Sequence, residues 1–135
     1  MRPPVFLTGA TGFLGMEVLA RLLEQGDREI VALVRARDNE EASERLDGIL
    51  RRLWRDPSPY RGRVRAVAGD VTSAGLGIDA AERTGIAEDI GAIMHCAASI
   101  SFDMPRPTGW PIALSFGAPL RRSSQVLRLT PACCR

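Results

Sequence analysis

The sequence predicts an α/β fold in which helices cover both faces of a parallel sheet, an arrangement called doubly wound. Four short apolar runs alternate with longer segments whose apolar residues recur at helical spacing. This alternation is typical of parallel strands joined by crossover helices. The runs are almost continuously apolar, as expected of strands buried on both faces. Three glycines, spaced by three residues, follow the first run directly, and they predict a tight turn from a strand into a helix.

The first half of the pattern holds two strands and one helix. Val5–Leu7 is the first expected strand, and a helical pattern runs from about Gly12 to Gln25. Gly26 is placed to end that helix. The second expected strand, Glu29–Val34, leads into a loop over Arg35–Asn39.

The second half repeats the alternation. A helical pattern from about Glu40 to Trp54 precedes the breaking residues Pro57, Ser58 and Pro59. We then expect a strand over Arg63–Ala68, a glycine-rich loop, a short helix near Ala80–Asp89 and a strand over Ile90–His95. The expected strand order is 3-2-1-4, that of the N-terminal half of a Rossmann-type sheet, which binds its ligand at the carboxyl ends beside strand 1.

Charge divides the chain into two parts. Residues 1–103 hold 13 arginines and all 16 acidic residues, whereas residues 104–135 hold 5 arginines and no acid. We expect residues 1–105 to form the half-domain and residues 106–135 to form an irregular basic tail. Because the tail has neither a helical arginine stripe nor interleaved aromatic residues, we do not expect nucleic-acid binding.

Further patterns restrict the class of protein. Apolar runs too short for a membrane span and the lack of a signal-peptide pattern predict a cytoplasmic protein. The three cysteines, Cys96, Cys133 and Cys134, form neither a disulfide framework nor a metal site. We expect Cys96 to be a small buried residue of the fourth strand.

The glycine loop predicts a dinucleotide site. Gly9 permits the tight turn, Gly12 leaves room for phosphates, and Gly15 lets the helix pack close to the sheet. The N-terminus of the helix then directs N–H groups at the pyrophosphate. The alternative is an ordinary turn, but a preceding strand, a following helix and a second strand within about thirty residues favour nucleotide binding.

Four sequence blocks, in order, resemble one protein family. They are Thr8–Gly15, Leu33–Ala36, Val67–Val71 and His95–Ser99. The chain resembles the extended short-chain dehydrogenase/reductases, and within them the thioester reductase and fatty acyl-CoA reductase branch. The resemblance implies an oxidoreductase that transfers a hydride from NADPH to the carbonyl of an acyl thioester, giving an aldehyde or alcohol. The acyl group would be carried by coenzyme A or by a carrier protein.

The residue after the second strand indicates which dinucleotide binds. NAD-preferring folds place an acid there, whereas this chain has Arg35, whose guanidinium suits the 2′-phosphate of NADP(H). The resemblance implies that Arg45 joins it, with Arg37 as a nearby substitute. The alternative is that these arginines are solvated, with Arg45 paired to Glu41 one helical turn away.

The resemblance implies further cofactor-binding residues. Asp70 would accept a hydrogen bond from the adenine amino group beside the Val71 N–H, unless it is only a turn residue. Small residues after the fourth strand would let the backbone approach the ribose, or would simply pack tightly. We expect the one histidine, His95, to be structural at a buried strand end. The implied cofactor-binding set is Gly9, Thr11, Gly12, Phe13, Leu14, Gly15, Arg35, Arg45, Asp70, Val71, Ala97, Ala98 and Ser99.

The catalytic residues that the resemblance implies are absent from this sequence. The family uses a Tyr-x-x-x-Lys pair as proton donor and ribose ligand, but this sequence has no lysine, and its one tyrosine, Tyr60, falls in an expected proline-flanked loop. We therefore assign no catalytic residue and expect the chain to be inactive by itself. The family pattern also stops at about Pro105, which suggests a truncation or a reading-frame error from about Arg106 onward.

Other functions stay open on the sequence alone. A non-catalytic NADP-binding sensor would share the glycine loop, and so would a fragment of an NAD-dependent sugar-nucleotide epimerase or dehydratase, although Arg35 argues against NAD. A structural fragment without any ligand is a further alternative. Four strands without a fifth would leave one side of strand 4 unpaired, so we expect self-association through this sheet edge.

Overall fold

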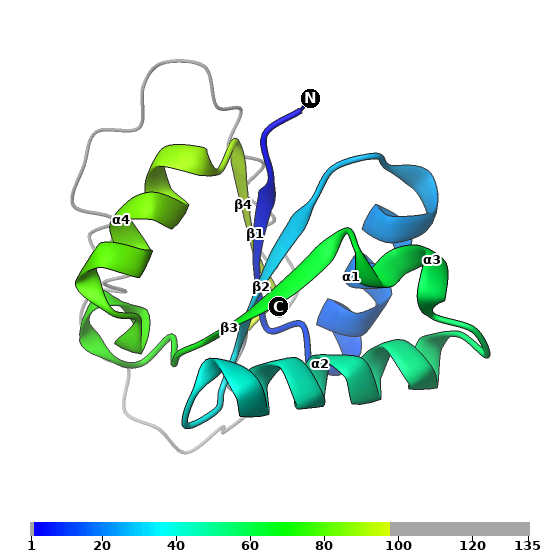
Figure 1. Cartoon of the computed structure of the whole chain (residues 1–135), viewed down its shortest axis with the longest axis horizontal. Helices are drawn as coiled ribbons and strands as arrows, with labels where there is room; N and C mark the ends of the chain where they lie inside the picture. The colour runs from blue at the N-terminus through cyan, green and yellow to red at the C-terminus, as the bar shows by residue number, and fades with distance from the viewer. Residues whose placement is uncertain (1, 98–135) are drawn as a thin grey trace, which may run out of the picture.

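A computed structural model of the chain describes residues 2–97, and these form one parallel sheet with helices on both faces (Figure 1). The strands are β1 (Val5–Thr8), β2 (Ile30–Val34), β3 (Val64–Ala68) and β4 (Ala92–His95). The helices are α1 (Phe13–Gln25), α2 (Asn39–Leu53), α3 (Ser58–Arg61), the short 3-10 turn η1 (Ala74–Gly77) and α4 (Ala80–Asp89).

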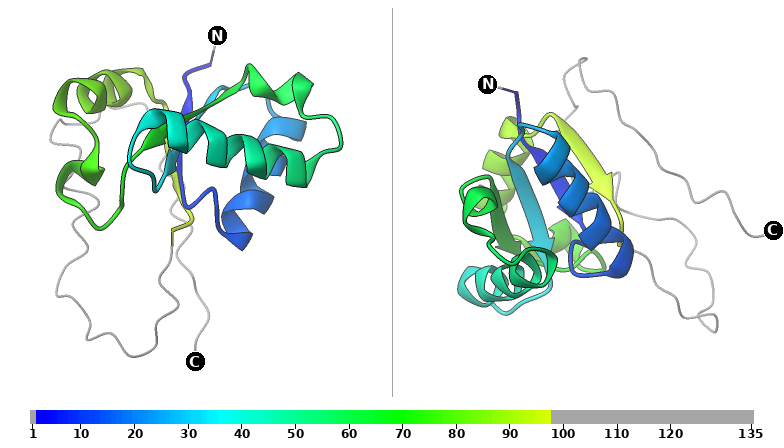
Figure 2. Two further views of the ribbon diagram at one scale, coloured as in Figure 1. Left: turned by 60° about the horizontal axis from the view of Figure 1, so that its bottom comes forward. Right: turned by 90° about the vertical axis from the view of Figure 1, so that its right-hand side faces the viewer.

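The strand order is β3-β2-β1-β4 and all three pairings are parallel, which confirms the predicted order. Thr8 at the end of β1 lies opposite Leu33 on one side and His95 on the other. Along the chain, β2 and β3 lie on one side of β1, whereas β4 lies on its other side. Figure 2 shows the sheet from two further sides. In open parallel sheets such a change of side opens a crevice at the carboxyl ends of the strands.

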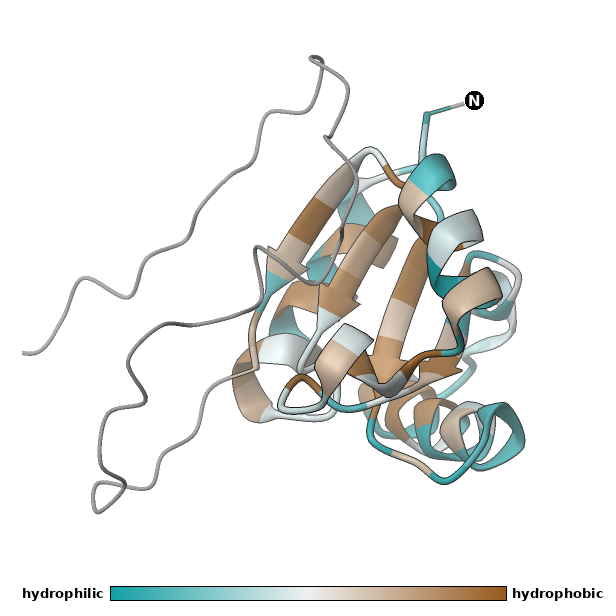
Figure 3. Cartoon of the chain, turned by 90° about the vertical axis from the view of Figure 1, so that its left-hand side faces the viewer, coloured by the Kyte–Doolittle hydropathy of each residue, from teal (hydrophilic) through white to brown (hydrophobic). Residues whose placement is uncertain are grey.

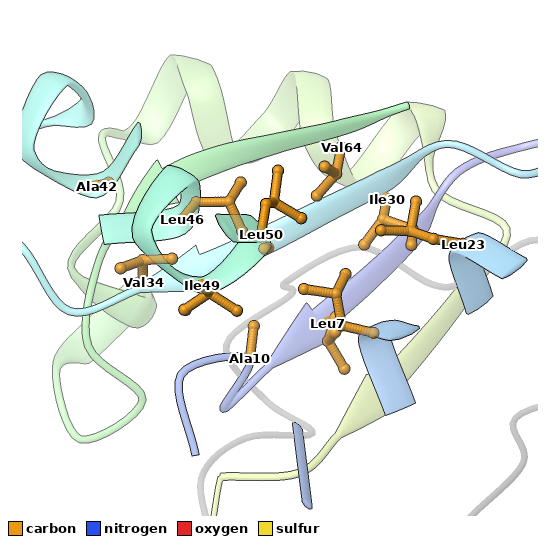
Figure 4. Close-up of a cluster of buried hydrophobic side chains, with 12 residues drawn as sticks. Leu7, Ala10, Leu23, Ile30, Val34, Ala42, Leu46, Ile49, Leu50 and Val64 are labelled. Carbon is orange, nitrogen blue, oxygen red and sulfur yellow. The ribbon is translucent and has the colours of Figure 1, made fainter. Parts of the chain in front are cut away.

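Two apolar clusters hold the layers together, one on each face of the sheet. The first joins alternate strand residues such as Leu7 and Ile30 to Leu23 of α1 and Leu50 of α2 (Figure 4). The second lies on the opposite face, where Phe6 and Val67 pack with Ile86 of α4. The hydropathy colouring of Figure 3 shows the same distribution, with the strongly hydrophobic residues concentrated in the strands. Both faces of β1 and β2 are thus buried, which explains the unbroken apolar runs of these two strands.

Polar groups fix the ends of the helices. The Asp38 carboxylate accepts the Glu41 N–H at 2.8 Å and begins α2, and Asp79 caps α4 in the same way. The C-terminal end of α1 has no basic residue in its last turn. Arg63, at the start of β3, instead donates to the carbonyl oxygens of Leu23 at 2.8 Å and Gly26 at 2.6 Å.

The structure corrects two local expectations. Tyr60 lies on α3 and not in a loop, because a proline in the first turn of a helix costs no hydrogen bond. Its ring stacks on Trp54, with ring centroids 4.2 Å apart. The expected glycine-rich loop contains η1, where Gly75, Leu76 and Gly77 all have positive φ. This left-handed turn buries Leu76 in the second apolar cluster, which compensates for its unfavourable backbone conformation.

Candidate functional site

The carboxyl edge of the sheet gathers the segments that the sequence predicts to bind a ligand. Gly9 follows β1, Arg35 follows β2, Asp70 follows β3 after one residue, and Ala97 follows β4 after one residue. Because all four strands are parallel and in register, these segments lie at one end of the sheet. The fold thus brings together residues that are up to 88 positions apart in the sequence.

Gly9 makes the turn between β1 and the loop that leads to α1. Its φ is +75°, and a Cβ at this position would lie 2.4 Å from the Ala97 nitrogen. The Gly12 N–H closes the turn by donating to the Gly9 carbonyl at 3.0 Å. Only glycine satisfies both the left-handed backbone and the contact with the chain leaving β4. Gly9 and Ala97 therefore lie against each other, as expected of two parts of one site.

The N-terminus of α1 is open to a ligand. Gly12 is exposed and forms the N-cap without a side-chain cap, so the first-turn N–H groups have no intrahelical or side-chain acceptor. Thr11 is exposed as well, and the side chains of Phe13 and Leu14 are 91% and 58% exposed. Gly15 is buried against the backbone of Gly9, which draws this end of the helix onto the turn.

Arg35 and Asp70 meet at the ends of β2 and β3. The Arg35 Nε lies 3.0 Å from the Asp70 Oδ2, and the Arg35 side chain is 73% exposed. The other carboxylate oxygen of Asp70 accepts the backbone N–H of Thr72 at 2.8 Å and its hydroxyl at 2.7 Å. These bonds, with the Arg35 charge, hold the pKa of Asp70 below its usual value. Asp70 thus has the turn role that the sequence left open, and its second carboxylate oxygen faces Arg35.

The backbone of Asp70 is fixed by the left-handed turn η1. The Asp70 N–H donates to the Leu76 carbonyl at 2.7 Å, and Val71 packs against the cluster that buries Leu76. Asn39 at the start of α2 adds a second tie, because its side-chain oxygen accepts the Ala68 N–H at 2.7 Å. The sequence predicted neither the Asp70–Leu76 nor the Ala68–Asn39 hydrogen bond. A buried leucine with positive φ leaves no local pattern in the sequence, and neither does a polar contact between distant segments.

Arg45 reaches back from α2 to the end of β2. Its NH1 donates to the Arg35 carbonyl at 2.6 Å, and its NH2 lies 2.7 Å from the Glu41 Oε1. The ion pair with Glu41 that the sequence offered as the alternative is therefore present, and Arg45 also contacts the Arg35 carbonyl. A role of Arg45 in binding a phosphate stays a prediction. Arg37 also binds Glu41, whose pKa falls to about 2 because of hydrogen bonds from Arg37 first and from Arg45 second.

The residues at the end of β4 are less covered than the sequence suggested. His95 is exposed and Cys96 is half-buried after the strand, because β4 pairs only with β1 within residues 2–97. The His95 Nδ1 forms a hydrogen bond with the hydroxyl of Thr8, which is itself buried. Partial burial lowers the pKa of His95 and raises that of the Cys96 thiol.

Several predicted features lie outside the described residues. They are Ala98 and Ser99 of the predicted cofactor-binding set, and the tail from 106 to 135. Of the helices within residues 2–97, none combines the length and the apolar character that crossing a bilayer requires.

Comparisons with known proteins agree on one family. The model of an NAD-binding domain family, described as male sterility protein, matches residues 7–114 and so extends past residue 105. Fatty acyl-CoA reductase wat of Drosophila melanogaster is 36% identical over 107 residues, which cover 73% of this chain and 20% of that protein.

Solved structures give the same result. The reductase (R) domain of a non-ribosomal peptide synthetase from Mycobacterium tuberculosis is 34% identical with a TM-score of 0.66, over 74% of this chain and 25% of that one. The terminal R domain from the myxalamid PKS-NRPS biosynthetic pathway is 34% identical with a TM-score of 0.69, over 77% of this chain and 27% of that one. The chain thus spans between 20% and 27% of the length of these three relatives.

Proposed function

This chain belongs to the male sterility protein family of NAD(P)-binding domains, and on that premise we propose that it is the NADPH-binding part of an oxidoreductase that reduces acyl thioesters. A fatty acyl-CoA is a thioester, and a fatty acyl-CoA reductase and two R domains of peptide-synthesising systems are among its relatives. An acyl group held by coenzyme A or by a carrier protein is therefore the proposed substrate class, with an aldehyde or alcohol as product.

The glycine loop carries the proposal. Near the N-terminus of α1, a Cβ on Gly12 would lie 3.4 Å from the Gly9 carbonyl oxygen and, apart from its chain neighbours, within 4 Å of no other atom of residues 2–97. Among the described residues, the space that a side chain would occupy is therefore open. The uncapped first-turn N–H groups, from Phe13 onward, provide donors and a partial positive charge at this opening. A pyrophosphate meets both requirements, because it is anionic and needs close approach to the backbone.

The arginines favour NADPH over NADH. The Arg35 Nε lies 3.0 Å from the Asp70 Oδ2, and the Arg35 side chain is 73% exposed. The Arg45 guanidinium is anchored 2.6 Å from the Arg35 carbonyl. Two guanidinium groups at the end of β2 suit a 2′-phosphate, which accepts charge-assisted hydrogen bonds. We assign the adenine to Asp70 and Val71, and the ribose beside the nicotinamide to Ala97, Ala98 and Ser99.

In this proposal the chain binds and orients the cofactor. NADPH, when bound, supplies a hydride for reduction of the thioester carbonyl. The 135 residues contain no lysine, so a Tyr-x-x-x-Lys pair does not lie among them and we assign no catalytic residue. We expect the chain as given to bind NADPH and to reduce nothing by itself.

A titration tests the proposal. We expect the full chain to bind NADPH about tenfold or more tightly than NADH, the size of effect that hydrogen bonds to a charged group produce. Arg35→Ala should remove most of this preference and leave NADH binding in place. Arg52→Ala is the matched control, because Arg52 is exposed on α2 and takes part in no ion pair among residues 2–97. Equal affinity of the unmodified chain for the two nucleotides would refute the choice of NADPH.

A further inference from the structure

Glu41 binds two arginines at the proposed phosphate site. Its Oε2 accepts the backbone N–H and the Nε of Arg37, both at 2.9 Å. Its Oε1 lies 2.7 Å from the NH2 of Arg45, one helical turn further along α2. The Glu41 side chain is 20% exposed, whereas those of Arg37 and Arg45 are 86% and 51% exposed. A largely covered carboxylate thus holds two largely solvated guanidinium groups.

These contacts join the loop after β2 to the first turns of α2. The Glu41 N–H is bound by Asp38, and Arg45 spans the distance from the Glu41 carboxylate to the Arg35 carbonyl. Arg45 therefore has one nitrogen fixed by Glu41 and another fixed at the end of β2. Among residues 2–97, the bond to the Arg35 carbonyl is the one contact of this long side chain that would remain without Glu41.

We propose that Glu41 is a positioning residue that sets the preference for the 2′-phosphorylated cofactor by holding Arg45 at the Arg35 carbonyl and by holding Arg37 in the loop after β2. This inference rests on the proposed function. A free arginine loses rotamer freedom when it binds a phosphate, and this loss reduces affinity. An arginine that is already ordered by a carboxylate has lost that freedom before the ligand arrives. Glu41 would therefore strengthen binding of the phosphate without touching it.

The negative charge of Glu41 acts in the opposite direction, because a carboxylate repels a nearby phosphate. Three donors from Arg37 and Arg45 already surround this carboxylate, so its charge is compensated locally. Solvent and salt around the two exposed guanidinium groups weaken what remains. We therefore expect the ordering effect to outweigh the repulsion. The two effects predict opposite changes when the charge is removed, which makes the inference testable.

The test uses Glu41→Gln in the full chain, with calorimetric titration of NADPH, NADH, adenosine 2′,5′-bisphosphate and AMP. We expect the affinity for NADPH and for the bisphosphate to fall about fivefold to tenfold, the effect of releasing one or two long side chains. Affinity for NADH and AMP should stay within about twofold, since neither carries a 2′-phosphate. Glu40→Gln is the matched control, because it removes the same charge from an exposed position in the same helical turn.

The outcomes separate this inference from the proposed function. An unchanged ratio of NADPH to NADH affinity in Glu41→Gln, or a ratio that rises, would overturn the positioning role. A parent chain with no preference for NADPH would instead refute the proposed function. If Glu41→Gln binds neither NADH nor AMP, the variant has lost the fold. The test then uses Glu41→Asp, whose side chain is one methylene too short to hold both arginines. A lower ratio of NADPH to NADH affinity in this variant supports the positioning role, and an unchanged or higher ratio overturns it.

Discussion

A Cβ on Gly15 would lie 1.8 Å from the carbonyl oxygen of Gly9. The contact partner is backbone, which cannot rotate away as a side chain can. We therefore predict that Gly15→Ala pushes α1 off the turn and destabilises the protein by about 1–3 kcal/mol, as overpacking of a close contact does. Urea unfolding measures the loss, and nucleotide binding should weaken because the N-terminus of α1 moves with it.

Gly48→Ala is the control for this prediction. Gly48 lies within α2, and a Cβ there would have no neighbour within 4 Å. Alanine is the better helix former, so we expect Gly48→Ala to raise the free energy of unfolding by about 0.5–1 kcal/mol. Equal effects of the two substitutions would contradict the role of the contact between α1 and the turn.

Arg63 is predicted to stabilise the C-terminal end of α1. Its guanidinium donates to the carbonyls of Leu23, Gly26 and Arg28, and no basic residue of α1 itself serves this end. Arg63→Ala leaves these acceptors without their charged donor and should lower the free energy of unfolding by about 2 kcal/mol. Arg65→Ala, which removes an exposed arginine from the adjoining strand β3, should change the free energy of unfolding by less than about 0.5 kcal/mol.

His95 should make stability depend on pH near neutrality. Burial lowers its folded-state pKa from an ordinary value near 6.5, so the unfolded chain binds the proton more readily. Its contribution is therefore present above about pH 6.5 and is lost as the pH falls through the folded-state pKa. We predict a lower urea midpoint at pH 5.5 than at pH 7.5. Because the sequence has one histidine, His95→Asn should flatten this dependence, and an unchanged slope would contradict the prediction.

The outer edge of β4 is predicted to promote self-association. Within residues 2–97, β4 pairs with β1 alone, and its apolar residues are only half-buried. Unpaired strand edges readily accept a strand from another chain. Sedimentation velocity of the full chain should therefore show a sedimentation coefficient that rises with protein concentration. A monomer that persists unchanged over a hundredfold dilution range, about the span this method covers, would oppose this proposal.

The sequence predicted the layout of the fold because its local patterns are strong. Apolar runs and helical spacing predicted all four strands and three of the helices, and the strand order followed from the alternation of strands and helices, which is typical of a doubly wound sheet. Helix α3 was missed because prolines usually indicate a break, although the first turn of a helix tolerates them. The contacts of Arg63 with α1 were missed because they join segments about 40 residues apart and leave no local pattern.

The sequence predicted which segments gather at the carboxyl edge of the sheet and offered the pairing of Arg45 with Glu41, but it did not predict the pairing of Arg35 with Asp70. The residues that follow parallel strands must gather at one edge, so Gly9, Arg35 and Asp70 could be named in advance. That Arg35 binds Asp70 depends on side-chain conformations across neighbouring strands. The roles of these residues in cofactor binding stay predictions, and so does the loss of family sequence from about Arg106. Translation of the neighbouring reading frames would test the latter, since a Tyr-x-x-x-Lys pattern there would support it.

The contact between Gly9 and Ala97 has a consequence for biosynthesis. The turn that follows β1 leaves the ribosome early, but the backbone against which it rests is almost 90 residues behind it. Closing so long a loop carries a large entropic cost, and docking of β4 must supply the compensating interactions. A nascent chain that contains only β1, β2 and β3 would have the glycine turn but not the Ala97 backbone that packs against Gly9. If the chain has the proposed function, cofactor binding would begin only after β4 has docked on β1.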